Sequence, residues 1–238
     1  DVCSSDLQRK KAQSYNHDIR GINMEMAQYL DRLLLRYSGT FDIYKPYFID
    51  GKEYPAYGYF FSHLEKYVLV REANLWASDS YEHILFITAD KITEEHVKEA
   101  QDVIQNYMEP KLVRKGARVP EKDHMYSFLT VILLSQYPPD RNTLKSVKRY
   151  SFDKGYRFNL RGFSTGHMAL VSMEDRKITC NRAAAKKVKL LKEIFEEVDA
   201  GKPGFDELCE KKDVKPFSQK GRTGDGEREP EDGEKQGL

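Results

Sequence analysis

Apolar residues recur with the period of an α-helix in several stretches of the chain. From Met26 to Tyr37 they occupy positions i, i+3, i+4, i+7, i+8 and i+11, which form one stripe along an amphipathic helix. Gly39 follows this stripe and suits the left-handed position after a helix C-terminus. Thr93 and Asn181, two residue types that cap helix N-termini, precede similar stripes. The pattern predicts helices at 26–37, 94–109, 142–150 and 182–199.

Other stretches alternate between apolar and polar residues, or are apolar throughout, as strands are. Asp50-Gly51 lies between two aromatic-rich runs and is a strong signal for a two-residue hairpin turn. The nearly continuous apolar run at 125–136 predicts a central strand with both faces covered. Short spacing favours antiparallel pairing across a turn at Ser78-Asp79-Ser80. Strands are predicted at 66–77, 81–89, 125–136 and 156–161, and in a hairpin that turns through Glu174-Asp175.

Together these elements predict an α+β fold, with a largely antiparallel, twisted sheet packed against several helices. The apolar stripes lie within 24–200, which is expected to form a single domain, and both ends of the chain are expected to be disordered. Residues 211–238 contain seven basic and seven acidic residues and almost no aliphatic ones. Such a segment cannot bury enough apolar surface to offset its chain entropy. We therefore predict that 201–238 is a disordered polar tail.

The first 23 residues are interpreted as a non-native or disordered leader. Asp1–Leu7 resembles a translated sequencing adapter, because DVCSSDL can be back-translated into the end of a common one. Residues 20–24 can be encoded by a ribosome-binding site just before a start codon at Met24. The alternative is a disordered basic arm around 8–11. A start at Met24 opens directly into a helix without a secretory signal, so a cytoplasmic location is expected.

Composition narrows the classes of protein that fit. The 238 residues carry a net charge of +1, so the total charge gives no indication of nucleic-acid binding. The longest apolar run, at 128–134, is far shorter than the roughly 18 residues of a membrane-spanning helix. Cys3, Cys180 and Cys209 lie far apart and form no CxxC pair, which argues against a disulfide framework and a zinc site. We expect no metal, no cofactor and no membrane partner.

The charges are nonetheless divided unevenly along the chain. Residues 72–110 contain nine acidic and two basic residues, whereas 141–192 contain fourteen basic and three acidic ones. A cationic face among aromatic-rich strands suits phosphate groups, as in RNA or single-stranded DNA. Alternatively, the two halves pair with each other or form solvated faces, an interpretation that the near-zero total charge favours. The candidate binding residues are Lys145, Lys148, Arg149, Arg157, Arg161, Arg182, Lys186 and Lys187.

A different hypothesis starts from the acidic half of the chain. Acidic side chains on adjacent strands can hold a divalent metal for phosphodiester hydrolysis, and the order of elements loosely resembles restriction-endonuclease-like nucleases. Their Asp…Glu-x-Lys signature is absent, and turn and cap positions account for Asp79 and Asp90. Ser164 and His167 form only a weak hydrolase pattern, because Ser164 lacks the Gly-x-Ser-x-Gly elbow. The catalytic residues of this alternative are Glu72, Asp79, Glu82 and Asp90.

Four segments together resemble an uncharacterised bacterial family, a domain of unknown function from anaerobic Gram-positive bacteria. They are YLDRLLLRYSGTFDI, VREANLWA, SFLTVILLS and YRFNLRGF, and the resemblance covers about residues 24–196. Its motifs are packing motifs, so it implies an intracellular globular domain and supplies no catalytic residue.

The leading hypothesis is a non-enzymatic binding or interaction module of the bacterial cytoplasm. Its basic surface at 141–192 would contact a partner, either nucleic acid or an acidic protein surface. The alternative is a metal-dependent nucleic-acid-processing enzyme that uses the acids near 72–90.

Overall fold

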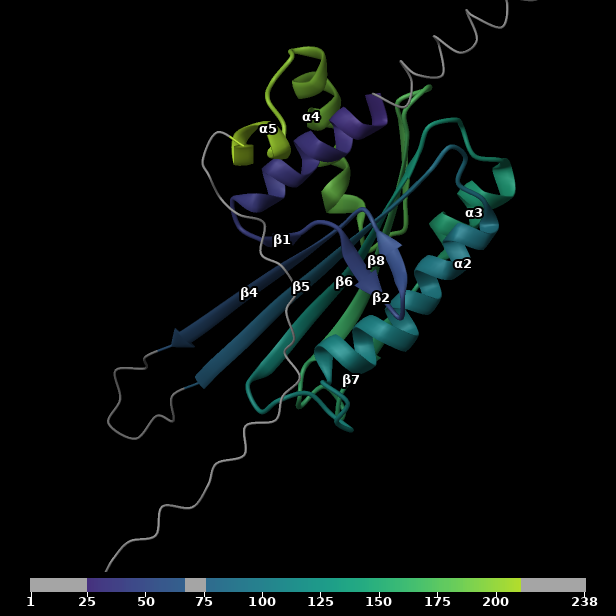
Figure 1. The fold of residues 1–238 in the computed structure, drawn as a ribbon. Coiled ribbons are helices and arrows are strands. Elements are labelled where there is room, and N and C mark those ends of the chain that lie inside the picture. Colours follow the sequence, from purple (N-terminus) through teal and green to yellow (C-terminus); the bar gives the residue numbers. More distant parts are fainter. Residues whose placement is uncertain (1–24, 67–75, 211–238) are drawn as a thin grey trace, which may run out of the picture.

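The structure, a computed structural model, describes residues 25–66 and 76–210 and has three layers (Figure 1). The middle layer is a seven-stranded mixed sheet in the order β1-β4-β5-β6-β8-β7, and β9 pairs with β8 on the same side as β7. Its strands are β1 (Asp42–Tyr44), β4 (Ala56–Lys66), β5 (Trp76–Ala89), β6 (His124–Ser135), β7 (Asp153–Gly155), β8 (Phe163–Ser172) and β9 (Lys177–Cys180). The predicted α+β class is confirmed.

One face of the sheet is covered by the helix at 25–38 and by α4 (Val188–Asp199). Both helices bury the apolar stripes that predicted them, and Leu33 of the first and Leu191 of the second are fully buried. The hydroxyl of Tyr29 donates a hydrogen bond to the backbone carbonyl of Leu191 at 2.6 Å. This bond ties the first helix of the described residues to α4.

The opposite face is covered by helices and a separate hairpin. These elements are α2 (Glu94–Asp102), the π-helix η1 (Val103–Val113), α3 (Arg141–Arg149), β2 (Tyr47–Ile49) and β3 (Lys52–Tyr54). The hairpin turns through Asp50 and Gly51 with φ of 48° and 84°, as predicted for a two-residue turn. Between the two layers, β6 contributes Leu133 to this core and Leu134 to the other. Its continuous apolar sequence reflects burial on both faces, as expected.

Four of the six strand pairings that the structure describes in the sheet are antiparallel, but the centre of the sheet is parallel, which the sequence did not predict. β5 pairs with β6, and β6 with β8, in parallel register, whereas β4 and β5 are antiparallel. Parallel neighbours require a crossover across one face of the sheet. α2 and η1 form the crossover from β5 to β6, and α3 lies in the crossover from β6 to β8. The sequence predicted these helices, but it did not predict that they connect parallel strands.

The turn predicted at residues 78–80 does not exist. Asp79 and Ser80 lie within β5, where Asp79 is opposite His63 of β4. The Asp79 carboxylate is hydrogen-bonded to His63 Nδ1 at 2.5 Å, so the polar residues at this point belong to a cross-strand pair. Most of the strand predicted at 66–77 falls outside the described residues.

The strand predicted at 156–161 is a turn between β7 and β8. Arg157, Phe158 and Asn159 have φ of 48°, 55° and 66°, all in the left-handed region. Gly162 closes the turn with φ of 73°, and a side chain there would meet the Met125 carbonyl oxygen at 2.1 Å. The alternation of apolar and polar residues therefore did not arise from a pleated strand.

Two predicted ends lie farther along the chain than expected. The helix that begins at Glu94 continues through Pro110 as η1, because Val113 still packs in the core. Past residue 200, α5 (Phe205–Glu210) forms, and Phe205 packs against the core beside α4. The predicted tail therefore begins with an ordered helix, whereas 1–24 and 211–238 lie outside the described residues. In the described parts of the chain, no helix combines the length and apolar character needed to cross a bilayer.

Candidate functional site

A groove opens at the edge of the sheet, where β7 and β9 pair with different parts of β8. It is lined by the end of α3 and the segment at 150–153 on one side, and by 181–183 on the other. Gly166 of β8 lies between the stretches that pair with β7 and β9 and also lines the groove. The groove has a volume of about 580 Å³, which is enough for several ligand atoms to enter.

Asn181 holds the two sides of this groove together. Its side-chain amide is almost fully buried and donates to the backbone carbonyls of Tyr150 at 3.2 Å and Gly166 at 2.9 Å. The Asn181 side-chain oxygen accepts from the backbone N–H groups of Met168 and Ala184, both at 3.1 Å. Asn181 was predicted as a helix cap. It does cap the chain just before the short helix η2 (Ala185–Lys187) that leads into α4, and it also shapes the groove.

Three of the predicted basic residues line the groove. Lys148 and Arg149 come from the last turn of α3, and Arg182 follows Asn181 on the other side. All three side chains are exposed, and none forms an ion pair with any residue that the structure describes. Lys145 lies one helical turn before Arg149 on α3 and is also exposed and unpaired within the described chain. The groove therefore has a positive charge that no ion pair with a described residue neutralises.

The groove also contains a buried hydroxyl group without a partner. Tyr150 is 7% exposed, and its hydroxyl has no hydrogen-bond partner within the described structure. A buried hydroxyl that lacks a partner is destabilising, and burial raises the pKa of Tyr150 well above its usual value. A methyl group at Gly166 would lie 2.6 Å from this hydroxyl oxygen, so the glycine makes room for the Tyr150 ring against β8. The Tyr150 hydroxyl lies beneath the groove surface, and a bound group would reach it only if the side chain shifted.

One acidic residue, Asp153, lies among the groove residues. Its carboxylate accepts hydrogen bonds from Thr165 at 3.0 Å and from Ser151 at 3.4 Å. These bonds hold the carboxylate against β8 and partly satisfy its oxygens. The three cations still exceed this single acid in charge.

The remaining predicted basic residues lie elsewhere. Lys186 is exposed on η2, whereas Lys187 forms a short ion pair with Glu82 of β5. Arg157 and Arg161 lie in the turn between β7 and β8, and the Arg161 carbonyl is hydrogen-bonded to a ring nitrogen of His124. The structure therefore brings half of the predicted set to α3 and the groove and separates the other half. Pairing between the acidic and basic halves, the alternative interpretation, holds for Lys187.

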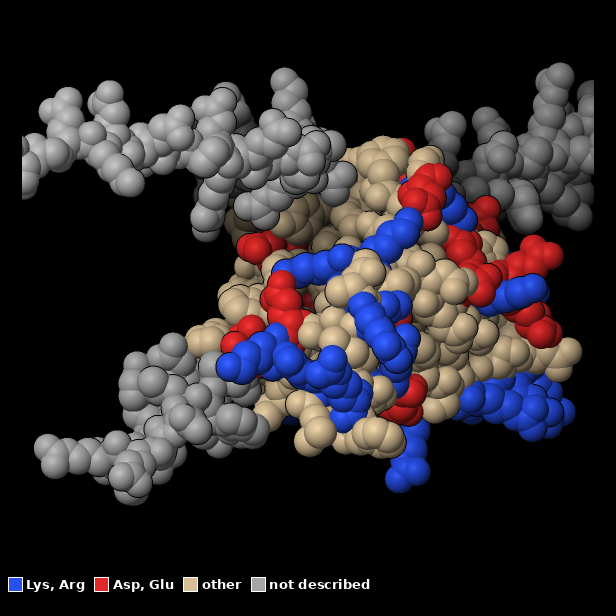
Figure 2. All heavy atoms as spheres, turned by 90° about the horizontal axis from the view of Figure 1, so that it is seen from below, with Lys and Arg blue, Asp and Glu red and all other residues tan. Residues whose placement is uncertain are grey.

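Figure 2 shows the end of the molecule that carries β7 and the turn between β7 and β8. Lys and Arg side chains gather across the middle and lower edge of this face, and acidic side chains lie mainly toward its two sides. Some of the cations near β7 are paired. Lys154 lies 3.0 Å and Arg114 2.6 Å from the carboxylate of Glu109. A surface that is rich in Lys and Arg therefore does not necessarily offer unpaired positive charge to a ligand.

Glu109 is a buried polar residue that the sequence did not single out. Besides its two cations it accepts a hydrogen bond from the hydroxyl of Tyr156 at 3.0 Å, and that hydroxyl is 2.8 Å from Ser164. Burial opposes ionisation, but hydrogen bonds from Arg114, Lys154 and Tyr156 outweigh it and lower the pKa of Glu109. Its position before a proline had indicated only a helix end. This network joins η1 to β7 and β8 and serves the fold.

The acidic residues of the nuclease hypothesis do not come together. Asp79 and Glu82 are three residues apart on β5 and so point to opposite faces of the sheet. Glu82 is held by the Thr130 hydroxyl at 3.0 Å and by Lys187. Asp90 follows the far end of β5, about 26 Å from Glu82 at the usual strand rise, and Glu72 lies outside the described residues. Within the described chain, no three His, Cys, Asp or Glu residues are grouped to hold a metal.

The weak pairing of Ser164 with His167 is also wrong. These residues are three apart on β8 and lie on opposite faces. Ser164 is bonded to Tyr156, and His167 packs against Phe128 with ring centroids 5.0 Å apart.

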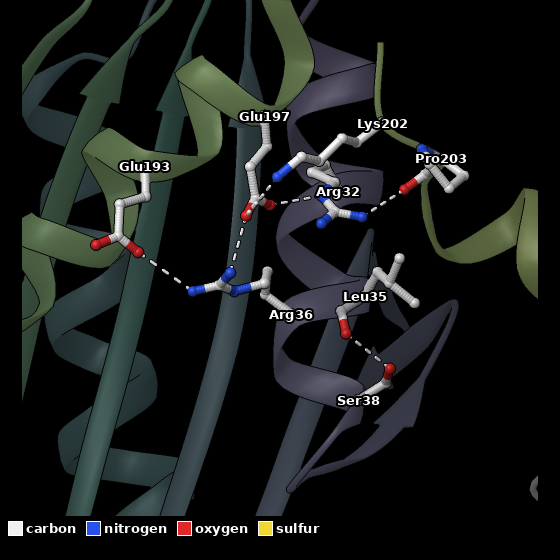
Figure 3. Close-up of polar contacts among 8 residues, drawn as sticks. All are labelled: Arg32, Leu35, Arg36, Ser38, Glu193, Glu197, Lys202 and Pro203. Carbon is white, nitrogen blue, oxygen red and sulfur yellow. Dashed lines mark hydrogen bonds and ion pairs between the residues drawn. The ribbon is translucent and has the colours of Figure 1, made fainter. Parts of the chain in front are cut away.

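Other arginines form a saturated cluster between the helix at 25–38 and α4 (Figure 3). Arg32 Nε lies 2.6 Å from Glu197, Arg36 lies 2.8 Å from Glu197 and 3.2 Å from Glu193, and Lys202 lies 3.7 Å from Glu197. Burial opposes ionisation of Glu197, but the hydrogen bond from Arg32 and the charges of Arg36 and Lys202 outweigh it and lower its pKa. We call these five residues the helix ion cluster. In this cluster the cations are paired with carboxylates of the same chain.

Comparison with known proteins identifies the family. A family model described as "Domain of unknown function (DUF8052)" matches residues 25–193, well over half of the chain. The chain belongs to the DUF8052 family. The match begins with the first helix of the fold and ends within α4, so the DUF8052 region includes the whole sheet and the basic groove. No curated protein and no solved structure matches the chain significantly. The family agrees with the resemblance to a domain of unknown function, and it does not assign a role to any residue.

Proposed function

We propose that this DUF8052 protein is a non-enzymatic binding module whose basic groove takes up phosphate groups of nucleic acid in the cytoplasm. One observation carries the proposal. Lys148, Arg149 and Arg182 come from two separate parts of the chain and line one groove without an ion pair to any described residue. Unpaired cations that converge in this way repel one another, and an anionic ligand relieves that repulsion.

The donor set of the groove fits phosphate oxygens. Arginine donates two parallel hydrogen bonds to a phosphate, and lysine adds a mobile positive charge. Tyr150 would add a neutral hydroxyl donor once a shift of its side chain exposes the buried hydroxyl to the groove. Asp153 disfavours a bare anion, but its carboxylate is turned to Thr165. Three cations and a hydroxyl outnumber it.

Nucleic acid is favoured over an acidic protein surface by the neighbourhood of the groove. Phe158, in the turn between β7 and β8, is 100% exposed, and Phe163, at the start of β8, is 40% exposed. Aromatic rings beside cations are typical of proteins that bind single-stranded nucleic acid. An acidic protein would need the cations and would make no special use of the rings.

The test measures binding of a fluorescently labelled single-stranded oligonucleotide as a function of salt. The variant Lys148→Ala/Arg149→Ala/Arg182→Ala should bind about 100-fold more weakly, at about 1 kcal/mol per lost charged contact. The slope of log affinity against log salt should become shallower by about 2, because each phosphate contact on a single strand contributes about 0.7.

A matched control removes the same charge elsewhere. Lys91, Lys98 and Lys192 are exposed and unpaired with described residues outside the groove, so Lys91→Ala/Lys98→Ala/Lys192→Ala should retain most of the affinity. Equal losses in both triple variants would contradict a specific groove. Tighter binding of labelled poly-glutamate than of the oligonucleotide would replace nucleic acid with an acidic protein as the partner.

A further inference from the structure

A row of aromatic side chains lies next to the groove on the sheet face that carries the helix at 25–38 and α4. Tyr126 and Phe128 alternate along β6, and Phe163 is the register partner of Tyr126 on β8. Ring centroids are 5.1 Å apart for Tyr126–Phe128 and 6.2 Å for Tyr126–Phe163. We call Tyr126, Phe128 and Phe163 the aromatic platform.

The covering helices stop short of this platform. Ile132 of β6 and Ala169 of β8, farther along the same face, are fully buried beneath the helix at 25–38 and α4. Lys187 immediately precedes α4 and forms an ion pair with Glu82. The Thr130 hydroxyl also donates a hydrogen bond to Glu82, so α4 begins at the level of Thr130 on β6. In Figure 1 the two helices lie over the upper part of the sheet and the strands continue below them. Tyr126 and Phe128 are half-buried, and Phe163 is exposed.

The platform and the basic groove are neighbours. Asp153 lines the groove and accepts a hydrogen bond from Thr165. Thr165 is two residues after Phe163 on β8, so both side chains lie on the platform face of the sheet. Gly155, two residues farther along β7, is the register partner of Phe163. Only the short strand β7 therefore separates the cations from the rings.

The turn between β7 and β8 continues this arrangement. It begins directly after Gly155 and ends directly before Phe163. It carries Arg157 and Arg161 and holds Phe158 fully in solvent. Its backbone is fixed from within, since Arg161 N–H donates to the Tyr156 carbonyl at 3.1 Å. Positive charge and an exposed ring therefore meet again at the far end of β7.

We infer that the ligand of the groove is a single-stranded nucleic acid, which passes over β7 so that its unpaired bases stack on the aromatic platform. This inference rests on the proposed function of the groove. Aromatic side chains bind bases through their flat faces, and in a duplex those faces are covered by neighbouring base pairs. The groove supplies phosphate contacts without regard to strandedness, and the platform selects the single strand.

The experiment compares four ligands of matched length with the full chain. They are oligo-uridine, an abasic oligonucleotide, a duplex and inorganic polyphosphate. Wild-type protein should bind oligo-uridine about tenfold more tightly than the abasic oligonucleotide or polyphosphate, the effect of one stacked base. The duplex should bind no better than the abasic strand.

Phe163→Ala tests the platform itself. It should weaken oligo-uridine binding about tenfold and leave polyphosphate binding and the salt slope unchanged, because it removes a ring and no charge. Phe48→Ala is the matched control, since Phe48 is 48% exposed on the separate hairpin, which packs against the opposite face. It should change neither ligand's affinity.

Phe163→Trp supplies a fluorescence signal that changes only when a base stacks on the platform. This variant should keep its affinity, and its added tryptophan fluorescence should be quenched by oligo-uridine and not by polyphosphate. Wild-type protein, with its single tryptophan, gives the background signal. Far-ultraviolet circular dichroism verifies that each variant is folded, and the comparison of ligands on wild-type protein does not depend on any variant.

The outcomes separate the two proposals. If wild-type protein binds neither oligo-uridine nor polyphosphate, the proposed function of the groove fails. If it binds both equally and Phe163→Ala has no effect, the groove is a phosphate site and the platform inference is overturned. Tighter binding of the duplex than of the single strand also overturns it.

Discussion

The helix ion cluster and the basic groove contain the same residue types and use them in opposite ways. In the cluster, Arg32 and Arg36 share the carboxylates of Glu193 and Glu197 at 2.6–3.2 Å. In the groove, Lys148, Arg149 and Arg182 have no such carboxylate among the described residues. Charges that are matched within the chain stabilise the fold, and charges left unmatched are free for a ligand. The location of the carboxylates, not the number of cations, separates the two regions.

The strongest test of this comparison is Glu197→Gln. The Glu197 side chain is 9% exposed and that of Arg32 is 12% exposed, so the substitution leaves a nearly buried guanidinium without its counter-charge. We expect the free energy of unfolding to fall by about 3 kcal/mol. Guanidinium chloride denaturation followed by circular dichroism measures it.

Glu193→Gln is the control within the same cluster. The Glu193 side chain is 36% exposed, and it pairs with the exposed Arg36 at 3.2 Å and with the exposed Lys189 at 3.9 Å. A solvent-exposed pair contributes little, so the loss should stay below about 1 kcal/mol. Equal losses from both variants would mean that burial does not set the strength of this cluster.

The cluster should also make stability depend on pH in the acid range. The pKa of Glu197 is lowered in the folded state from an ordinary value of 4.5, so the unfolded state takes up the proton first. The stabilisation is therefore fully present above the unfolded pKa and is lost as the pH falls through the folded pKa. The difference in stability between wild type and Glu197→Gln should be largest near neutral pH and shrink below pH 4.5. A difference that stayed constant down to about pH 3 would contradict the assignment.

The groove variant should behave differently in the same stability assay. Lys148→Ala/Arg149→Ala/Arg182→Ala removes exposed side chains that hold no described partner. Its free energy of unfolding should remain within about 1 kcal/mol of wild type, although ligand binding is lost. Unfolding of this variant would show that the groove cations serve the fold as the cluster does.

The smallest expected effect is the most specific. Tyr150→Phe removes a buried hydroxyl that has no hydrogen-bond partner among the described residues, so stability should stay the same or rise by a few tenths of a kcal/mol. Oligonucleotide affinity should fall a few-fold, because one neutral hydrogen bond to the ligand is lost. Titration of the labelled oligonucleotide measures this loss, and thermal unfolding measures the stability. A Tyr150→Phe protein that is less stable and binds normally would place the hydroxyl in the fold.

The sequence predicted those features that depend on neighbouring residues. The stripe from Met26 to Tyr37, the Asp50-Gly51 turn and the apolar run of β6 each specify their local structure, and each is confirmed. The parallel pairing of β5, β6 and β8 could not be predicted in this way, because it depends on where two crossover helices pack.

The candidate site was predictable in the same limited sense. A run of basic residues marked 141–192, but only the fold decides that Lys187 pairs with Glu82 and that Arg182 pairs with no acid among the described residues. The orphaned hydroxyl of Tyr150 and the exposure of Phe163 also depend on elements that are distant in sequence. A pattern along the chain shows which residues can take part in a site, and the packing shows which of them do.

The link between the helix at 25–38 and α4 has a consequence for biosynthesis. Arg32 and Glu197 are 165 positions apart, so the face of the sheet beneath these helices cannot be closed until the chain up to Glu197 has left the ribosome. At about 5–20 residues per second, that interval lasts roughly ten to thirty seconds. Throughout it the nascent chain exposes an apolar surface made of the first helix and unfinished strands. Cellular production of this protein should therefore be sensitive to chaperones that bind nascent chains.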